Sequence, residues 1–253
     1  MNDKVVLVTG GTGGIGSAIC LRLAQAGARV VVGYRNSADK AQALLGKLPR
    51  TEHLAMQVDV TDSQSLAQLA DAVGATYGRL NALVNCHGVT TPVAHHDLDA
   101  LSDAWIDRIF SINWRGAFAC VRALKPLLMT TAQTSGETSV IVNISSVAGV
   151  TGVGSNVAYC ASKAAIDSMT RSLGRALAPH IRVMSVSPGW VLGEYAAKVD
   201  PVYLKAQTEA TPLKKLATPD DVADAVLAVC MLLKSSTGSI VPVDGGRPLG
   251  SAK

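Results

Sequence analysis

Short runs of apolar, often β-branched residues alternate along this chain with longer segments of helical periodicity. The runs lie at residues 5–10, 29–35, 54–60, 82–86, 140–146, 182–189 and 239–246. Because nearly every residue in these runs is apolar, we expect strands that are covered on both faces, as in a parallel sheet between layers of helices. Strands that alternate with helices, such as those expected at 15–28 and 62–78, predict βαβ units and an α/β fold.

The length of 253 residues and a hydrophobic content of 48% allow one large domain with a sizeable core. We find no internal repeat, no low-complexity linker and no break in composition. The sequence therefore predicts a single domain over residues 1–253.

The charge and the cysteines of the chain indicate which binding partners and which cellular compartment to expect. The net charge is +4, and Lys and Arg are scattered, so we expect neither nucleic acid nor a membrane surface as partner. Five widely spaced cysteines without a C-x-x-C pair argue against disulfides and zinc. His95 and His96 have no third ligand close in sequence, so no metal is assigned. No run is long enough to span a membrane, and we expect a soluble, cytoplasmic protein.

The segment TGGTGGIG, residues 9–16, connects the first expected strand to the first helix. Glycines there let the backbone approach a pyrophosphate, and a helix N-terminus offers free N–H groups and a positive dipole end. Two spacings fit: G-x-G-x-x-G over residues 11–16 and T-G-x-x-x-G-x-G over residues 9–16. Both predict a phosphate-binding loop, although a tight turn required for steric reasons remains an alternative.

The end of the second expected strand bears on the choice of dinucleotide. NAD-selective folds usually place Asp or Glu about 20 residues past the glycines, whereas Arg there accommodates a 2′-phosphate. This chain has Arg35 followed by Asn36, and the first acidic residue beyond the strand is Asp39. We therefore expect NADP(H) to be favoured over NAD(H). A solvated surface arginine is the alternative interpretation.

Further motifs follow in a fixed order: Asn85-x-x-Gly88, SIN with Asn113, NISS with Ser146, Tyr159-x-x-x-Lys163, SPG at 187–189 and a closing VDGG. With the glycine loop they resemble the short-chain dehydrogenase/reductase family over essentially the whole chain, and in particular its β-ketoacyl-acyl carrier protein reductases and related carbonyl reductases. The resemblance implies a doubly wound Rossmann-type domain with about seven parallel strands and helices on both faces. It also implies hydride transfer between NADP(H) and a small carbonyl or secondary alcohol.

Tyr159 and Lys163 share one face of a helix because they are four positions apart. Bringing a tyrosine pKa from ~10 to neutral pH takes about three units, roughly 4 kcal/mol. An ammonium about 6 Å away at an effective dielectric of about 20 supplies roughly 3 kcal/mol. We therefore expect Lys163 to lower the pKa of Tyr159. A buried aromatic and a solvated lysine are the alternative interpretation.

The resemblance implies a role for each catalytic candidate. Tyr159 is the general acid in reduction and the base in oxidation, and Ser146 orients and polarises the carbonyl oxygen. Lys163 also holds the nicotinamide ribose, while Asn113 anchors a chain of water molecules that returns protons to the lysine. Ser145 is the rival hydroxyl, but adjacent residues of a strand point to opposite sides, and the family alignment selects Ser146.

The resemblance also implies cofactor contacts from the glycine loop, the strand ends and the catalytic helix, namely Gly10, Thr12, Gly13, Gly14, Ile15, Gly16, Arg35, Asn36, Asp59, Val60, Asn85, Gly88, Tyr159, Lys163, Pro188, Gly189 and Val191. Asp59 could instead cap the helix that follows it, a role that Thr61 or Asp62 could equally take.

Three departures from the family pattern limit what the resemblance implies. Cys86 and His87 replace the usual inner residues of Asn-Asn-Ala-Gly; His87 could tune the ribose site, but we favour packing with a hydrogen bond. Family members commonly have a threonine that contacts the nicotinamide carboxamide, and this chain has Gly193 at that position. No basic residue lies between Lys125 and the next strand. An acyl carrier protein is thus a less favoured partner, and 3-oxoacyl-acyl carrier protein reduction is an alternative function. A dinucleotide-binding sensor without turnover is an alternative of another class.

Two further expectations concern the substrate lid and the assembly. Residues 192–212 correspond to the family's mobile lid, with an apolar wall expected from Trp190, Leu192, Tyr195, Tyr203 and Leu204. Family members assemble through the helices expected here at 111–128 and 156–177 and through the last strand. Two different two-fold interfaces generate a closed tetramer, so we expect a homotetramer. The same apolar faces could instead cover the chain's own sheet.

Overall fold

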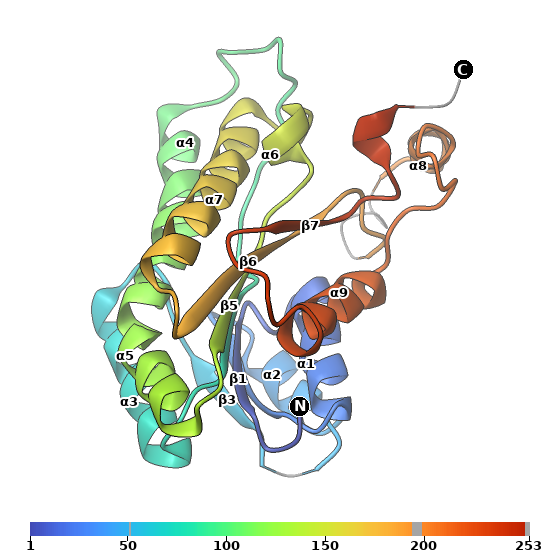
Figure 1. Cartoon of the computed structure of the whole chain (residues 1–253). Coiled ribbons are helices and arrows are strands. Elements are labelled where there is room, and N and C mark those ends of the chain that lie inside the picture. Colours follow the sequence, from blue (N-terminus) through green and yellow to red (C-terminus); the bar gives the residue numbers. More distant parts are fainter. Residues whose placement is uncertain (51, 194–198, 251–253) are drawn as a thin grey trace.

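The computed structural model describes residues 1–50, 52–193 and 199–250 of the chain. Within them one parallel sheet has the strand order β3-β2-β1-β4-β5-β6-β7 (Figure 1). The strands are β1 Val5–Thr9, β2 Arg29–Tyr34, β3 Leu54–Gln57, β4 Ala82–Asn85, β5 Ser139–Ile144, β6 Ile181–Pro188 and β7 Ile240–Val243. The seven-stranded, doubly wound fold expected from the sequence is confirmed.

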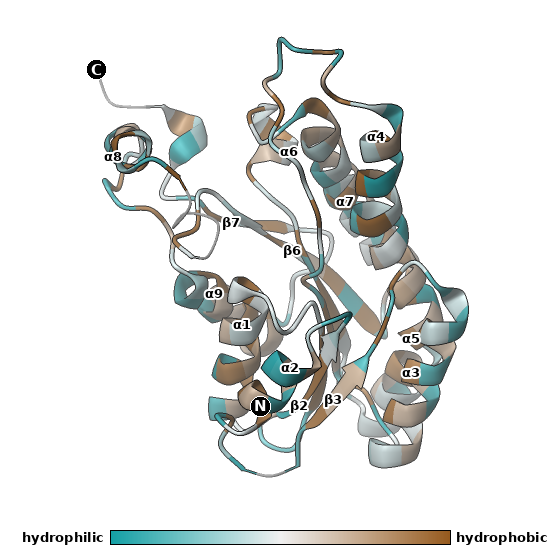
Figure 2. Cartoon of the chain, turned by 180° about the vertical axis from the view of Figure 1, so that it is seen from behind, coloured by the Kyte–Doolittle hydropathy of each residue, from teal (hydrophilic) through white to brown (hydrophobic). Residues whose placement is uncertain are grey.

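Helices cover both faces of the sheet (Figures 1 and 2). One face carries α1 Gly14–Gln25, α2 Ala38–Leu45 and α9 Pro219–Met231, and the other carries α3 Ser63–Tyr77, α5 Ala117–Ser135 and α7 Val157–Ala176, with α4 Asp103–Phe110 beside α7. Strand β1 shows why both layers are needed. Val6 and Val8 belong to the first apolar core and Val5 and Leu7 to the second, because successive side chains point to opposite faces.

Several short elements lie beyond the carboxyl ends of the strands. They are the π-helix η1 Ser111–Gly116, α6 Ala148–Thr151, α8 Pro201–Glu209 and the 3-10 helix η3 Arg247–Leu249. The strand order reverses between β1 and β4, and ligands of open α/β sheets bind in the crevice outside such a point. Strand β3 is shorter than the predicted run 54–60, because the chain turns where the N–H of Asp62 bonds to the carbonyl of Asp59. Among the described residues, no helix is long and apolar enough to cross a bilayer.

Candidate active site

The glycine loop folds back on itself at the end of β1. Gly10 has φ +66°, and a Cβ built there would lie 2.9 Å from the Cα of His87. A Cβ on Gly16 would collide with the carbonyl of Gly10, whereas Gly13 and Gly14 are exposed and have room for one. A Cβ on Gly11 would lie 2.9 Å from Val32 Cγ1, so the packing requires glycine at positions 10, 11 and 16 and is compatible with both spacings. The first N–H groups of α1 have no partner within the helix, and such groups can donate hydrogen bonds to an anion.

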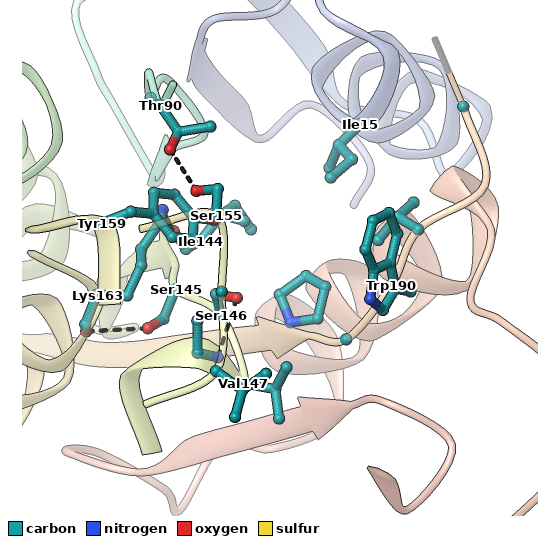
Figure 3. Close-up of a pocket in the computed structure, with 18 of the residues that line it drawn as sticks. Ile15, Thr90, Ile144, Ser145, Ser146, Val147, Ser155, Tyr159, Lys163 and Trp190 are labelled. Carbon is teal, nitrogen blue, oxygen red and sulfur yellow. Dashed lines mark hydrogen bonds between the residues drawn. The ribbon is translucent and has the colours of Figure 1, made fainter. Parts of the chain in front are cut away.

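A cavity of about 1340 Å³ opens beside this loop and reaches the catalytic candidates. Figure 3 shows Tyr159, Lys163 and Ser146 gathered at one part of it, with Ile15 and Trp190 across from them. Of the residues expected at the site, those lining the cavity are Gly10, Gly13, Gly14, Ile15, Gly16, Gly88, Ser146, Tyr159, Lys163, Pro188, Gly189 and Val191. Those not lining it are Thr12, Arg35, Asn36, Asp59, Val60, Asn85 and Asn113.

The orientation of Tyr159 is determined by the start of α7. Asn156 is buried at the N-cap position, where its Oδ1 accepts a 2.7 Å hydrogen bond from the N–H of Tyr159 and its Nδ2 donates to the carbonyl of Thr91 at 2.6 Å. An N-cap of this kind is worth about 1 kcal/mol. The cap therefore links the first turn of α7 to the loop that follows β4.

Ser146 and Ser145 follow β5 and have different environments. Ser145 is buried and its hydroxyl donates to the carbonyl of Lys163 at 3.2 Å. Ser146 is half-buried; its Oγ accepts from the N–H of Ala148 at 3.2 Å, and its hydroxyl acts to lower the pKa of Tyr159. The hydroxyl beside the phenol is thus that of Ser146, the residue that the family alignment selects.

Lys163 is 6% exposed, and its Nζ donates a 2.8 Å hydrogen bond to the carbonyl of Ile144. Burial lowers the pKa of Lys163 to about 8, opposed by Cys86 and by Asp167 one turn further along α7. A buried lysine keeps its charge poorly, because desolvation disfavours the ammonium. The pKa of Lys163 lies only slightly above pH 7, so the side chain is still mostly charged at that pH.

Tyr159 differs from the expectation in one respect. Burial raises the pKa of Tyr159, and the influence that lowers it is the hydrogen bond with Ser146 rather than the charge of Lys163. The prediction of a Tyr159 pKa lowered by Lys163 is therefore not met in the protein alone. The physical reason is that desolvation penalises the phenolate more than its neighbours stabilise it.

Asn113 lies in the π-helix η1, with its side chain buried and fully engaged. Its Oδ1 accepts from the N–H of Val89 at 2.8 Å, and its Nδ2 donates to the carbonyl of Val89 and to Ser162 Oγ, both at 3.1 Å. A Cβ on Gly88 would lie 3.4 Å from Asn113 Oδ1 and 3.9 Å from Lys163 Nζ. Gly88 is therefore in contact range of both side chains.

The Asn85–Gly88 segment contains two buried polar atoms without a hydrogen-bond partner. Asn85 donates to Asn143 Oδ1 at 2.9 Å, but its own Oδ1 has none. His87 Nδ1 is 2.7 Å from Thr9 Oγ1, while its Nε2 is buried and unpaired. Burial, helped by the charge of Lys163, lowers the pKa of His87 to about 4. His87 is thus neutral and packed with a hydrogen bond, the interpretation favoured from the sequence.

The strand ends that would meet an adenosine moiety are more exposed. Arg35 and Asn36 are exposed directly after β2. Asp59 Oδ1 accepts from the hydroxyl of Thr61 at 2.6 Å and from its N–H at 2.8 Å, and these bonds lower the pKa of Asp59, with a smaller contribution from the charge of Arg35. Asp62, which accepts from the N–H of Gln64, is the cap of α3. Asp59 therefore does not cap that helix.

The remaining wall of the cavity comes from the C-terminal part of the chain. The rings of Trp190 and Tyr203 meet edge to face at 5.6 Å, and both line the cavity. Leu192 is exposed and Leu204 does not line the cavity, while Tyr195 lies outside the described residues. Gly193 is exposed, and a Cβ there would come no closer to another group than 3.9 Å from Pro219.

Sequence reasoning missed several polar residues that line this cavity, among them His95, Asp200, Gln207 and Arg247. The only signal for Arg247 was its place directly after the closing VDGG, and His95 was interpreted as a surface residue. Its Nε2 is 3.0 Å from the carbonyl of Gly154. Across the described residues, no three His, Cys, Asp or Glu side chains gather as a metal site.

Comparisons with known proteins identify the family to which the chain is similar. A family model described as enoyl-(acyl carrier protein) reductase matches residues 10–247. The chain is 36% identical over 250 residues to L-xylulose reductase of Caenorhabditis elegans, covering 96% of this chain and 95% of that protein. It is 32% identical over 251 residues to 2,5-dichloro-2,5-cyclohexadiene-1,4-diol dehydrogenase of Sphingobium indicum, covering 98% and 97%.

Among solved structures, a 3-ketoacyl-(acyl-carrier-protein) reductase from Brucella melitensis complexed with NADH superimposes with a TM-score of 0.86. It is 28% identical in sequence, and the match covers 97% of this chain and 98% of that one.

Proposed function

Because the chain belongs to the short-chain dehydrogenase/reductase family and is an oxidoreductase acting on CH–OH groups, we propose that it interconverts a small ketone and its secondary alcohol with NADP(H). The cofactor would supply or accept the hydride. The observation that carries this proposal is the convergence of Ser146, Tyr159 and Lys163 on the cavity that the glycine loop also lines.

The residues around the loop fit a dinucleotide. The first turn of α1 offers N–H groups to a pyrophosphate, the unpaired Oδ1 of Asn85 is a buried acceptor, and the Lys163 ammonium lies at the same cavity. Gly10 and Gly16 leave no room for side chains where the phosphates would approach. We propose that the cofactor lies along this line, from the end of β2 to Lys163.

In reduction, Tyr159 would donate its phenolic proton to the carbonyl oxygen of the substrate. Its raised pKa keeps the phenol protonated at neutral pH, as a general acid must be. Ser146 would hydrogen-bond the same oxygen and polarise the carbonyl. The Lys163 ammonium would stabilise the phenolate that forms. Asn113 would anchor the chain of water molecules through which protons return to Lys163. In oxidation the same groups act in reverse.

The preference for NADP(H) is part of the proposal. Arg35 is exposed at the end of β2, and its charge reaches Asp59. A guanidinium there matches a 2′-phosphate through charge-assisted hydrogen bonds. The reductase from Brucella melitensis was solved with NADH. The affinities of the present protein for NADPH and NADH are therefore to be compared directly.

Reduction of a 3-oxoacyl group on an acyl carrier protein is the second candidate. The description of the matching family and the Brucella melitensis reductase favour it. Glu137 is the one charged residue between Lys125 and β5, and it pairs with Lys4. An acidic carrier would find no cation in that segment, so a small free ketone remains our first choice.

We further propose a homotetramer in the cytoplasm. Trp114 and Phe118 are each 37% exposed and their rings stack 6.1 Å apart, and α7, which packs against η1, exposes the small residues Ala161, Ala164 and Ser168. Such an apolar face supports helix packing between copies of the chain. The five cysteines are free thiols, which supports a reducing compartment.

The proposed function is tested by mixing the protein with NADPH and a panel of ketones and following the loss of NADPH absorbance. Turnover of at least one ketone is expected. Tight binding of NADPH without turnover of any ketone, and without oxidation of matched alcohols by NADP, would instead identify a sensor.

A further inference from the structure

The substrate end of the cavity contains an arginine that the proposed reaction does not use. Arg247 begins the 3-10 helix η3 and lines the same cavity as Tyr159 and Ser146. Figure 1 shows η3 beside α8, set off from α6 and α7, which lie on the other side. A substrate that presents its carbonyl to Tyr159 would extend toward this wall.

Arg247 is half-buried and held by one neighbour. Its Nη1 donates to the backbone carbonyl of Gln207 at 3.0 Å, and its Nη2 donates to Gln207 Oε1 at 2.6 Å. Both acceptors are neutral, and within the described residues no carboxylate forms an ion pair with this guanidinium. Since a guanidinium has five N–H donors, donors remain beyond the two that Gln207 occupies.

The other charged groups at the cavity do not neutralise it. Lys163 is buried at the catalytic end and bonded to Ile144, and His95 contacts the carbonyl of Gly154. Asp200 lines the cavity too, but its Oδ1 caps α8 by accepting from Val202 N–H at 2.9 Å. Linking α8 to η3 through two amide oxygens would not in itself require a positive charge. As far as the described residues go, the charge is therefore available for a ligand.

We propose that Arg247 binds a carboxylate of the substrate, so that the protein acts on an oxo acid and the corresponding hydroxy acid. The inference rests on the proposed function and adds the chemical class of the substrate. A planar guanidinium matches a carboxylate in a two-point geometry that a lysine cannot offer. A half-buried position makes this pairing stronger than an exposed one, because solvent screens it less.

The test compares each of three oxo acids, 2-oxobutanoate, 3-oxobutanoate and 4-oxopentanoate, with its own methyl ester. Each pair has the same reacting ketone and differs in charge, and the three acids differ in the spacing between ketone and carboxylate. We expect kcat/KM to favour one acid over its ester. In Arg247→Met that acid should lose roughly 10-fold or more, mostly through KM, since hydrogen bonds to charged groups are worth about 1.5–3 kcal/mol. The ester should change less than about threefold.

Lys205→Met is the matched control. Lys205 is exposed on α8, next to η3, and pairs with Glu209 at 3.9 Å, so the variant removes the same charge from the neighbouring helix outside the cavity. It should leave the acid-to-ester ratio unchanged. Equal losses for acid and ester in Arg247→Met, or a wild-type protein that prefers the esters, would overturn the inference. Unchanged NADPH affinity shows that the variant is folded.

Binding separates this inference from the proposed function. Trp190 lines the same cavity, so its fluorescence reports binding of an oxo acid to the NADPH complex without turnover. Arg247-dependent binding of the acid without reduction would contradict the proposed function and leave the carboxylate site standing. Turnover of ketones that does not depend on Arg247 would support the proposed function and contradict the carboxylate site.

Discussion

The ammonium nitrogen of Lys163 lies 5.7 Å from the centre of the Tyr159 ring, and the same nitrogen is held by the carbonyl of Ile144. The tether places the buried ammonium of Lys163 beside the half-buried phenol of Tyr159. Burial moves the two pKa values toward the neutral forms, upward for Tyr159 and downward to about 8 for Lys163. The pair thus consists of a protonated phenol and an ammonium only below about pH 8.

Replacing the phenol tests its role as general acid. Tyr159→Phe should lower kcat by about 10²–10⁴ and leave the Kd for NADPH within about threefold, because the hydroxyl acts on the substrate. Steady-state kinetics and NADPH fluorescence measure the two effects. Tyr203→Phe removes a hydroxyl from the same cavity and serves as the control. A Tyr159→Phe protein with near-normal turnover would contradict the mechanism.

Ketone reduction should decline as the pH rises through about 8, where Lys163 loses its charge. The sign follows from the lysine being cationic below its pKa and neutral above it. A pH profile of kcat/KM at saturating NADPH measures the decline. Lys163→Arg keeps its charge across that range, so its lower activity should not show this break. An unchanged break in Lys163→Arg would assign it to another group.

Arg35→Ala should weaken NADPH binding by about 1.5–3 kcal/mol and leave NADH nearly unaffected, because only NADPH carries the 2′-phosphate. Titration calorimetry with both cofactors gives the two affinities. Arg108→Ala removes an equivalent charge from α4, where the guanidinium lies 5.5 Å from the Trp105 ring, and should change neither. Equal weakening of NADPH and NADH by Arg35→Ala would show that Arg35 does not bind the phosphate.

His87 should make the fold sensitive to mild acid. Its folded pKa of about 4 lies below the unfolded value near 6.5, so the unfolded chain takes up the proton first as pH falls. This single group should therefore reduce the free energy of unfolding progressively from about pH 6.5 down to about pH 4, by roughly 3 kcal/mol in full.

Urea unfolding at pH 7 and pH 5 measures this effect. In His87→Leu the loss between the two pH values should be smaller than in the wild-type protein by about 2 kcal/mol. Replacement of the exposed His95 provides the control. If His87→Leu and the wild-type protein lose stability in parallel, the acid sensitivity comes from other groups.

Light scattering at micromolar concentration should give about four times the chain mass of 26.1 kDa. Combining Trp114→Glu with Phe118→Glu places charges on the exposed aromatic pair and should reduce the assembly to a dimer, since charge in an apolar interface is costly. Charge reversal at the exposed Lys205 should leave the mass unchanged. A wild-type monomer would contradict the proposed tetramer.

Much of the fold is predictable because its determinants are local. The apolar runs repeat with the period of a buried strand, and their order along the chain predicts the parallel sheet that β1 to β7 form. The facing of Tyr159 and Lys163 follows from helical spacing alone. Gly16 is required by contact with the neighbouring Gly10, whereas the space at Gly10 is limited by His87, which is distant in sequence.

The energetics of the site could not be predicted in this way, because they depend on burial and on residues distant in sequence. The pKa of Tyr159 is raised where a lowered value was expected, since the tertiary structure determines how much water reaches the phenol. Asn113 is held by Val89 and Ser162, which no spacing connects. Arg247 reaches the cavity only because β7 is the last strand of the sheet, with η3 placed against Gln207 of α8. Periodic sequence thus determined which elements form, whereas long-range packing decided which charges meet and how strongly water screens them.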